Sequence, residues 1–373
     1  MNTTSPYTSG LENVIAAQTS LSRVNGQLGE LVIAGYSAEE IAQKASFEEM
    51  IYLLWHGKRP TVDTLGAFSA ELRQKSALPE ETISLLKTAV SQKINPMAAL
   101  RMAAGTVDLD QSSTDRIKLG QLLVARFSTI VATYWRLLNG TDLIAPNSDL
   151  NHAANFLFML SGEVPSSTKS RALETYFNTV VDHGLNASTF AARVIIATQS
   201  DLVSAVTGAV GALKGPLHGG APGPALQLVF DIGTAENAEP FLRQKLDHNE
   251  RLMGFGHRVY KVRDPRAEIL GQAAKILYEN DGDMALYQLA QHVERTAVSL
   301  LNEYKPGRNL QTNVEFYTAL LLHGLGLHSD LFPAIFAMSR VAGWLAHCFE
   351  QQDNGRLIRP KAAYVGAEGL VWN

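Results

Sequence analysis

Only one stretch of this chain has the residue pattern of β-strands. In residues 22–36, SRVNGQLGELVIAGY, the Asn25-Gly26 pair can turn a hairpin into the β-favouring run LVIA. Elsewhere the apolar residues recur with the spacing of helices. The sequence therefore predicts an all-α protein with one minor N-terminal β-hairpin.

The clearest helical signal begins at Ser46. Ser46 and Glu49 form a capping box, and Gly57 supplies a left-handed stop. Four apolar residues between them share one helical face: Phe47, Ile51, Leu54 and Trp55. A second box, Ser37 with Glu40, predicts a short helix just upstream. Further helices are predicted at residues 80–93, 116–138, 151–161, 168–181, 187–197, 200–213, 221–231, 238–246, 265–279, 284–302, 313–325 and 331–350.

Length and composition limit the organisation of the chain and its partners. Because 373 residues exceed one core of ordinary size, two domains that meet at a cleft are expected. With 46% hydrophobic residues, 18% charged residues and a formal charge of −4, the chain is globular and has no global basic field. An anionic substrate must be held by local charges, and neither a nucleic acid nor a membrane is an expected partner.

Two features bear on the cellular compartment. The stretch 117–138 is the most membrane-like, but Lys118, Arg126 and Arg136 recur through it, so a buried core helix is predicted. The single cysteine, Cys348, cannot form an internal disulfide, and the N-terminal MNTTSPYTSG lacks the pattern of a secretory leader. We therefore expect a cytoplasmic protein.

The first segment with catalytic potential is GPLHGGA (215–221), a rigid turn that places His218 directly before an apolar helical stretch. The positive end of a helix disfavours imidazolium, so His218 is expected to be neutral. A neutral imidazole can donate one N–H to a developing enolate oxygen. A structural turn whose histidine is satisfied by the backbone is the alternative.

The second segment is GFGHRVYKVRDPR (254–266), which contains His257. Its two glycines permit close backbone approach to a ligand, and its basic cluster can hold carboxylates or phosphates. It is not a dinucleotide fingerprint, because a third glycine and a preceding strand are missing, and it lacks the Gly-Lys-Ser/Thr of a phosphate loop. The alternative is a solvated basic turn.

The third segment is TNVEFY (312–317), which opens an apolar helix. Thr312 or Asn313 can cap that helix, and Glu315 then lies in its first turn. A glutamate there is either ordinary capping chemistry or a carboxylate base. His323 and His328 lie five residues apart without a supporting ligand cluster, so no metal site is expected.

Together, these segments resemble the signature blocks of citrate synthases in order and spacing. Residues 10–57 resemble the N-terminal block of that family, and DHGLNASTF (182–190) is similar to its substrate-histidine block. The resemblance implies the two-domain citrate synthase fold, with a large helical domain (1–219 and 327–373) and a small helical domain (220–326). It also implies a homodimer whose domains close on the substrates.

The activity implied by the resemblance is condensation of acetyl-CoA with oxaloacetate to citrate and CoA, an acyl transfer of the tricarboxylic acid cycle. The CoA thioester is then a substrate, and no tightly bound cofactor is expected. His218 would donate to the thioester oxygen, Glu315 would remove the methyl proton, and His257 would donate to the ketone. The family positions that bind oxaloacetate match His183, Arg266 and Arg340, with Arg359 contributed by the partner subunit. The matched coenzyme A contacts are Leu217, Gly254, Phe255, Gly256 and Asn313, with Lys305 and Arg308 as further phosphate partners.

Glu315 departs from the family pattern, in which the base is usually aspartate. The carboxylate is retained one methylene further from the backbone, and a misplacement of about 1 Å can cost about a hundredfold in rate. Two alternatives stay open. One is a 2-methylcitrate synthase that uses propionyl-CoA, since one methylene in an acyl pocket is worth only about 1–3 kcal/mol. The other is a catalytically weak paralogue that binds oxaloacetate or CoA as a sensor.

Overall fold

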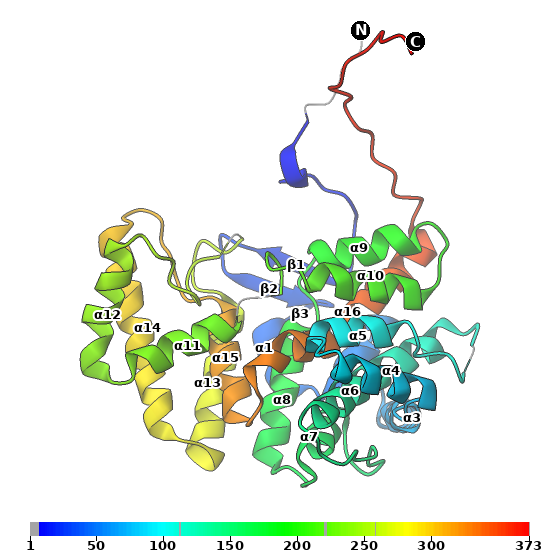
Figure 1. The fold of residues 1–373 in the computed structure, drawn as a ribbon, viewed down its shortest axis with the longest axis horizontal. Helices are drawn as coiled ribbons and strands as arrows, with labels where there is room; N and C mark the ends of the chain where they lie inside the picture. Colours follow the sequence, from blue (N-terminus) through cyan, green and yellow to red (C-terminus); the bar gives the residue numbers. More distant parts are fainter. Residues whose placement is uncertain (1–6, 112, 220–221, 258, 373) are drawn as a thin grey trace.

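The structure is a computed structural model that describes residues 7–111, 113–219, 222–257 and 259–372. The all-α prediction is confirmed: helices form most of the molecule, with one small sheet near the N-terminus (Figure 1). Three residues of the segments singled out above, Gly220, Ala221 and Arg258, lie outside the described residues.

The small sheet contains β1 (Ser22–Asn25), β2 (Glu30–Ile33) and β3 (Tyr36–Ser37), antiparallel in the order β1-β2-β3. The predicted hairpin is confirmed, but its turn spans residues 26–29, because Asn25 pairs with Glu30. Gly26 is required here, since a side chain at this position would collide with the Val259 carbonyl. Lys261 N also donates to Gly26 O at 2.9 Å. The hairpin turn therefore supports the loop that contains His257.

The larger set of helices packs around one long central helix, α16 (Phe332–Asn354). Helices α2, α5, α6, α8, α9 and α10 all contact it. The set around α16 comprises α1 (Ala38–Lys44), α2 (Phe47–His56), α3 (Val62–Gln74), α4 (Glu80–Ser91), α5 (Pro96–Ala104), α6 (Arg116–Leu138), α7 (His152–Ser161), α8 (Ser167–Val180), α9 (Ala187–Ile196) and α10 (Leu202–Leu213).

Helix α2 begins and ends as its sequence predicts. Glu49 N donates to the Ser46 hydroxyl at 3.2 Å, the Glu49 carboxylate accepts from Ser46 N at 2.8 Å, and Gly57 has a left-handed φ of 67°. Trp55 donates from Nε1 to Ala342 O on α16 at 3.0 Å. The amphipathic pattern of α2 therefore docks the helix on the core.

Both membrane-like stretches are core helices. The predicted stretch 117–138 is α6, and its residues from Gly120 to Tyr134 are buried. One helical segment of the described chain, Ser329–Asn354, is long and apolar enough to cross a membrane, and 89% of its apolar window is buried inside the protein. Its hydrophobicity is thus accounted for by packing.

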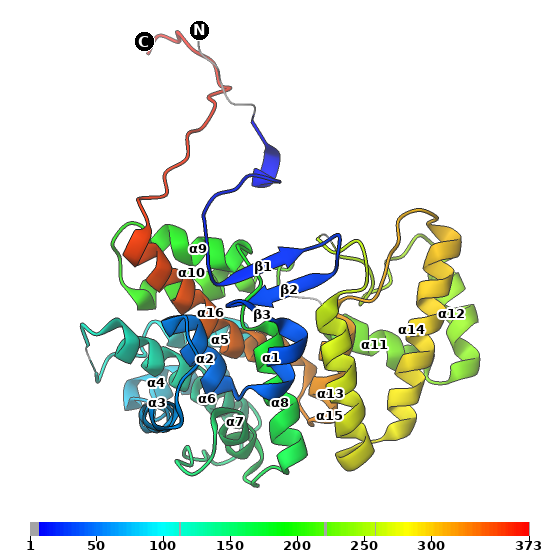
Figure 2. The same ribbon diagram turned by 180° about the vertical axis from the view of Figure 1, so that it is seen from behind.

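The smaller set of helices lies to one side of the first (Figures 1 and 2). It contains α11 (Pro222–Ile232), α12 (Ala235–Asp247), α13 (Pro265–Asp281), α14 (Met284–Tyr304) and α15 (Val314–Gly324). Helix α12 packs on α14, while α13 packs on α15 and on α8 of the larger set. The division into domains at 219/220 and 326/327 stays a prediction.

The two ends of the chain extend away from the body and run toward the same place (Figures 1 and 2). The N-terminal end has one turn of 3₁₀-helix, Ser9–Leu11, and the C-terminal end follows α16. Both expose large apolar side chains: Ile15 is 88% exposed, Val365 94% and Trp372 100%. Such exposure is unusual for side chains of this kind.

Candidate active site

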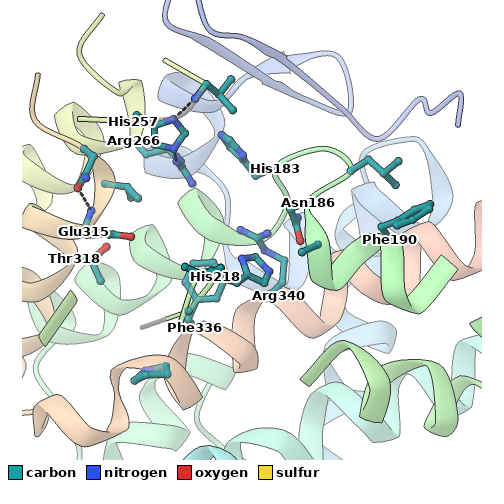
Figure 3. A pocket seen from close by; sticks show the side chains of 18 of the residues that line it. His183, Asn186, Phe190, His218, His257, Arg266, Glu315, Thr318, Phe336 and Arg340 are labelled. Carbon is teal, nitrogen blue, oxygen red and sulfur yellow. Dashed lines mark hydrogen bonds between the residues drawn. The ribbon is translucent and has the colours of Figure 1, made fainter. Parts of the chain in front are cut away.

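The three segments singled out in the sequence meet at one cavity of about 590 Å³ (Figure 3). His218, His257 and Glu315 all line it, although they come from a turn, a loop and a helix far apart in the sequence. The cavity is also lined by other residues assigned from the sequence: His183, Arg266, Arg340, Leu217 and Asn313. Ionisable groups and apolar walls thus share one enclosed space.

His257 is held in one orientation by the backbone of its own loop. Its Nδ1 accepts hydrogen bonds from Val259 N at 3.0 Å and Tyr260 N at 3.1 Å. The ring hydrogen of the neutral form is therefore on Nε2. Burial, with a smaller effect of Arg266, lowers the pKa of His257 to about 4. His257 is a neutral imidazole with a fixed tautomer.

Arg266 is buried beside that imidazole and paired with Asp264. Its Nε and Nη2 donate to the two carboxylate oxygens of Asp264 at 3.0 and 2.8 Å, and Asp264 also caps α13 by accepting from Arg266 N. Nη2 lies 3.4 Å from His257 Nε2. Since both atoms carry hydrogens, both can donate to one acceptor in the cavity. The alternative of a solvated basic turn is wrong for Arg266, which is only 4% exposed.

Arg340 contributes a second buried guanidinium, on α16. Its Nε donates to Val180 O at 2.6 Å, and its guanidinium carbon lies 4.6 Å from the centre of the Phe336 ring. No described residue forms an ion pair with it. Burial lowers the pKa of Arg340 to about 10; the attraction of Asp182 opposes this shift, and repulsion from Arg266 adds to it. An unpaired buried cation is costly, so this position favours an anionic ligand.

His183 lies between these groups at the end of α8. Its Nε2 is 3.0 Å from the Tyr260 hydroxyl, and its ring packs edge-on against those of His257 and Tyr260. Burial, followed by the two nearby arginines, holds the pKa of His183 well below its usual value. His183 is therefore neutral as well, and it can hydrogen-bond a ligand without adding charge.

His218 lies on the turn after α10, with its imidazole against the N-terminus of α9. Ser188 N donates to Nε2 at 3.3 Å, and Ser188 Oγ lies 2.8 Å from the same nitrogen. Trp344 Nε1 in turn donates to Ser188 Oγ at 3.0 Å. We assign Nε2 as the acceptor of Ser188 N–H, which places the ring hydrogen on Nδ1; the Ser188 hydroxyl itself donates to Asn186 Oδ1 at 2.8 Å.

His218 was predicted to be neutral because of the helix that follows it in sequence, but the main cause in the structure is burial. Burial is the largest cause that lowers its pKa to about 4, and Arg340 adds to the effect. The helix N-terminus against the ring is that of α9, not that of the helix that follows His218 in sequence. A backbone group does hydrogen-bond His218, as in the alternative of a purely structural turn, but this contact with Ser188 N leaves the ring N–H available to a ligand.

Glu315 lies in the first turn of α15, and its carboxylate points into the cavity (Figure 3). Asn313 caps the helix by accepting from Glu315 N at 3.0 Å, so the glutamate side chain is not the cap. Burial raises the pKa of Glu315, and Arg266 opposes that shift. A carboxylate of raised pKa beside neutral donors is suited to proton abstraction.

The loop 254–256 is fixed to the start of α15. Asn313 donates from Nδ2 to Gly256 O at 2.9 Å and from its backbone N to Gly254 O at 3.0 Å. Gly254 has a φ of 90°, and a side chain there would meet Phe316. Phe255 packs against Phe316 with ring centroids 5.4 Å apart. Leu217 is fully exposed at the rim of the cavity.

Six residues assigned from the sequence are not among those that line the cavity, and three of them, Gly254, Phe255 and Gly256, belong to the loop just described. Lys305 and Arg308 follow α14 and are not among the residues that line the cavity. Arg359 is exposed in the C-terminal end, away from the cavity of its own chain. In the described residues, no group of three His, Cys, Asp or Glu side chains has the arrangement of a metal site.

Several residues of the site were not identified from the sequence. Ser188 and Trp344 support His218, while Asp264 and Tyr260 support Arg266 and His183. Ser188, Asp264 and Tyr260 lie inside segments that were singled out in the sequence. Their contacts depend on the tertiary fold. Thr318 also lines the cavity, one helical turn after Glu315.

The chain matches known proteins along almost its whole length. The family model "Citrate synthase, C-terminal domain" matches residues 10–361. The citrate synthase of Haloferax volcanii and citrate synthase 2 of Bacillus subtilis are each 41% identical, over 97% of this chain and 96% of theirs. The 2-methylcitrate synthase of Mycobacterium tuberculosis is 38% identical over 97% of this chain and 91% of its own.

Solved structures agree with these relatives. The citrate synthase of Pyrobaculum aerophilum superposes with a TM-score of 0.88 at 36% identity, covering 97% of this chain and 93% of that one. The Thermoplasma acidophilum citrate synthase, solved as a ternary complex with carboxymethyl coenzyme A and oxaloacetate, has a TM-score of 0.88 at 29% identity, and the match covers 97% of both chains. This chain belongs to the citrate synthase family.

Proposed function

We propose that this protein condenses acetyl-CoA with oxaloacetate to give citrate and CoA. The observation that carries the proposal is the composition of the cavity, where two buried guanidinium groups and three neutral imidazoles face one carboxylate of raised pKa. A dicarboxylate needs cations, an enolate needs neutral donors, and a methyl proton needs a base.

The dicarboxylate end is built from Arg266, Arg340 and His183. Arg340 lacks an ion pair among the described residues, and Arg266 keeps Nη1 free of hydrogen bonds to them, so both can bind carboxylate oxygens. His257 Nε2–H would donate to the ketone oxygen of oxaloacetate. That donor polarises the carbonyl and stabilises the alkoxide that forms when its carbon is attacked.

The acyl end would carry out enolisation. Glu315 removes a proton from the methyl group, while His218 Nδ1–H donates to the thioester oxygen as negative charge develops there. The methylene carbon then forms the new bond to the ketone carbon, and the resulting alkoxide takes up a proton. Water finally cleaves the thioester bond, which releases CoA and leaves citrate.

Coenzyme A is a substrate in this scheme, and no resident cofactor is invoked. Leu217 and Asn313, which line the cavity, and the backbone of residues 254–256 would contact the adenine and pantetheine portions. Lys305 and Arg308 would reach the phosphates after the two sets of helices close around the ligand.

We further infer that the protein is a cytoplasmic homodimer in which Arg359 completes the site of the partner. The exposed apolar side chains of both chain ends support a second copy as their covering surface. Mixing Arg359→Leu with Glu315→Gln subunits tests this, because each mixed dimer regains one intact site. About a quarter of wild-type activity is then expected from random assembly, and no recovery would refute the shared site.

A second candidate is condensation of propionyl-CoA to 2-methylcitrate, which the relatives of that name favour. One methylene changes binding by only about 1–3 kcal/mol, so the two activities differ in degree. An assay of CoA release with oxaloacetate decides between them by comparing kcat/KM for acetyl-CoA and propionyl-CoA. No oxaloacetate-dependent release from either thioester would overturn the proposed function.

A further inference from the structure

Thr318 on α15 is a threonine of the cavity wall. The residue is only 2% exposed and lines the cavity, yet its hydroxyl makes no hydrogen bond within the described residues. Buried hydroxyls normally have a partner, and a threonine inside a helix commonly donates to the carbonyl four residues earlier. Thr175 and Thr179 on α8 follow that pattern, at 2.9 and 2.6 Å. Thr318 does not follow that pattern, so its hydroxyl is available to an acceptor in the cavity.

The neighbouring acceptor is the carboxylate of Glu315. Residues three apart on a helix share one face, and Figure 3 shows the oxygens of both side chains directed into the same part of the cavity. An ionised carboxylate only accepts hydrogen bonds, and a hydroxyl without a partner has a hydrogen to donate. Among the described residues, the Glu315 carboxylate also lacks a hydrogen bond. The two groups are complementary and unsatisfied.

We propose that Thr318 donates a hydrogen bond to the Glu315 carboxylate in the working site and is thereby a positioning residue for the base. The proposal rests on the proposed function, in which Glu315 removes the methyl proton. Glutamate has one more rotatable bond than the aspartate usual in this family, so its carboxylate needs an additional restraint. A hydroxyl fixed one turn along the same helix supplies it.

The charges around Glu315 do not replace this contact. Arg266 and Arg251 attract the carboxylate and Asp264 repels it, while His218, His257 and Arg340 line other parts of the same cavity. None of these groups hydrogen-bonds the carboxylate in the described part of the structure. A short-range donor is what selects one rotamer and favours the ionised form.

The test uses two substitutions that separate the hydroxyl from its packing. Thr318→Val keeps the volume and removes the donor, whereas Thr318→Ser keeps the donor and removes a methyl group. The proposal predicts that Thr318→Val lowers kcat and the rate of methyl-proton exchange about tenfold or more, as expected for the loss of a hydrogen bond to a charged group. It also predicts that the acid limb of the pH–kcat profile moves to higher pH, and that the KM for oxaloacetate is unchanged.

Thr318→Ser should retain the wild-type pH–kcat profile. If Thr318→Val had a kcat close to wild type and Thr318→Ser were impaired, Thr318 would have a packing role and the proposal would be overturned. Thr175→Val, which removes a back-bonded helical hydroxyl outside the cavity, is the matched control and should leave the pH profile unchanged. Failure of the proposed function is distinguishable, because the wild-type protein itself would then show no oxaloacetate-dependent CoA release.

Discussion

The two ends of the cavity differ in how much of their geometry is fixed without a substrate. At the dicarboxylate end, Arg266 is paired with Asp264, His257 is oriented by two backbone N–H groups, and Tyr260 lies against His183. At the acyl end, Glu315 and Thr318 line the cavity without hydrogen bonds from their side chains in the described residues. The groups proposed to bind the dicarboxylate are therefore held in place by contacts within the protein, whereas no hydrogen bond among the described residues fixes the side chain of the proposed base.

The largest effect expected at the dicarboxylate end follows from His257→Ala. Loss of the donor to the ketone oxygen should lower kcat by about 100-fold or more. The KM for acyl-CoA should change little, because His257 does not contact that substrate. His328→Ala removes an exposed histidine outside the cavity and is the control. Wild-type turnover in His257→Ala would count against its role.

Arg340→Leu tests the role of Arg340 in oxaloacetate binding separately from its role in the stability of the fold. The apparent KM for oxaloacetate should rise by about 10- to 100-fold, as for a lost hydrogen bond between charged groups, with a much smaller change for acyl-CoA. Arg340→Lys should also be impaired, since an ammonium cannot reproduce the planar fork. Equal effects on both substrates would reject the assignment.

The same substitution should not lower the melting temperature of the free protein. Arg340 is buried without an ion pair among the described residues, so leucine removes a desolvated charge. Arg126 is the matched control, because it is buried and paired with Asp110 through two hydrogen bonds of 2.6 and 2.8 Å. Arg126→Leu is expected to destabilise, and the two Tm shifts should differ in sign or clearly in size.

Glu315→Asp tests whether the acyl end is built around the longer side chain. We expect kcat to fall on the order of tenfold, because shortening the arm withdraws the carboxylate from the methyl group. The KM for oxaloacetate should stay unchanged. Equal or higher activity would mean that α15 already presents its first turn at the distance that suits aspartate.

The smallest effect concerns pH. Burial raises the pKa of Glu315, and the base must be ionised, so kcat should fall as the pH decreases through that raised pKa. His218 and His257, with pKa values of about 4, are neutral at pH 6 to 8 and should add no alkaline limb there. A loss of kcat as the pH rises from 6 to 8 would show that one of them acts as imidazolium.

The fold could be predicted where local signals are strong. The capping box and glycine stop of α2 and the hairpin of β1 and β2 were identified from residues within one turn of each other. Helices α3 and α5 were missed, because α3 buries only Phe68 and Leu72 and α5 begins at Pro96, which resembles a helix breaker. Strand β3 has only two residues, too few for a period-2 pattern.

The site could be predicted only in part. Glycine-flanked histidines and the TNVEFY segment marked His218, His257 and Glu315 as candidates. The groups that hold His218 could not be predicted, since Ser188 lies 30 residues from it in sequence and Trp344 lies 156 residues from Ser188, whereas those that orient His257 lie within three residues of it. Contacts across such separations follow from how α9, α10 and α16 pack, and no local pattern encodes them.

Solvent deuterium exchange into the methyl group of an acetyl-CoA analogue, with oxaloacetate bound, tests most directly whether Glu315 is the working base. Glu315→Gln keeps the shape of the side chain and cannot take up a proton, so exchange should be lost while folding and oxaloacetate binding persist. Glu268→Gln, a half-buried position on α13 outside the cavity, should exchange at the wild-type rate. Undiminished exchange in Glu315→Gln would contradict the account, because the base would then lie elsewhere.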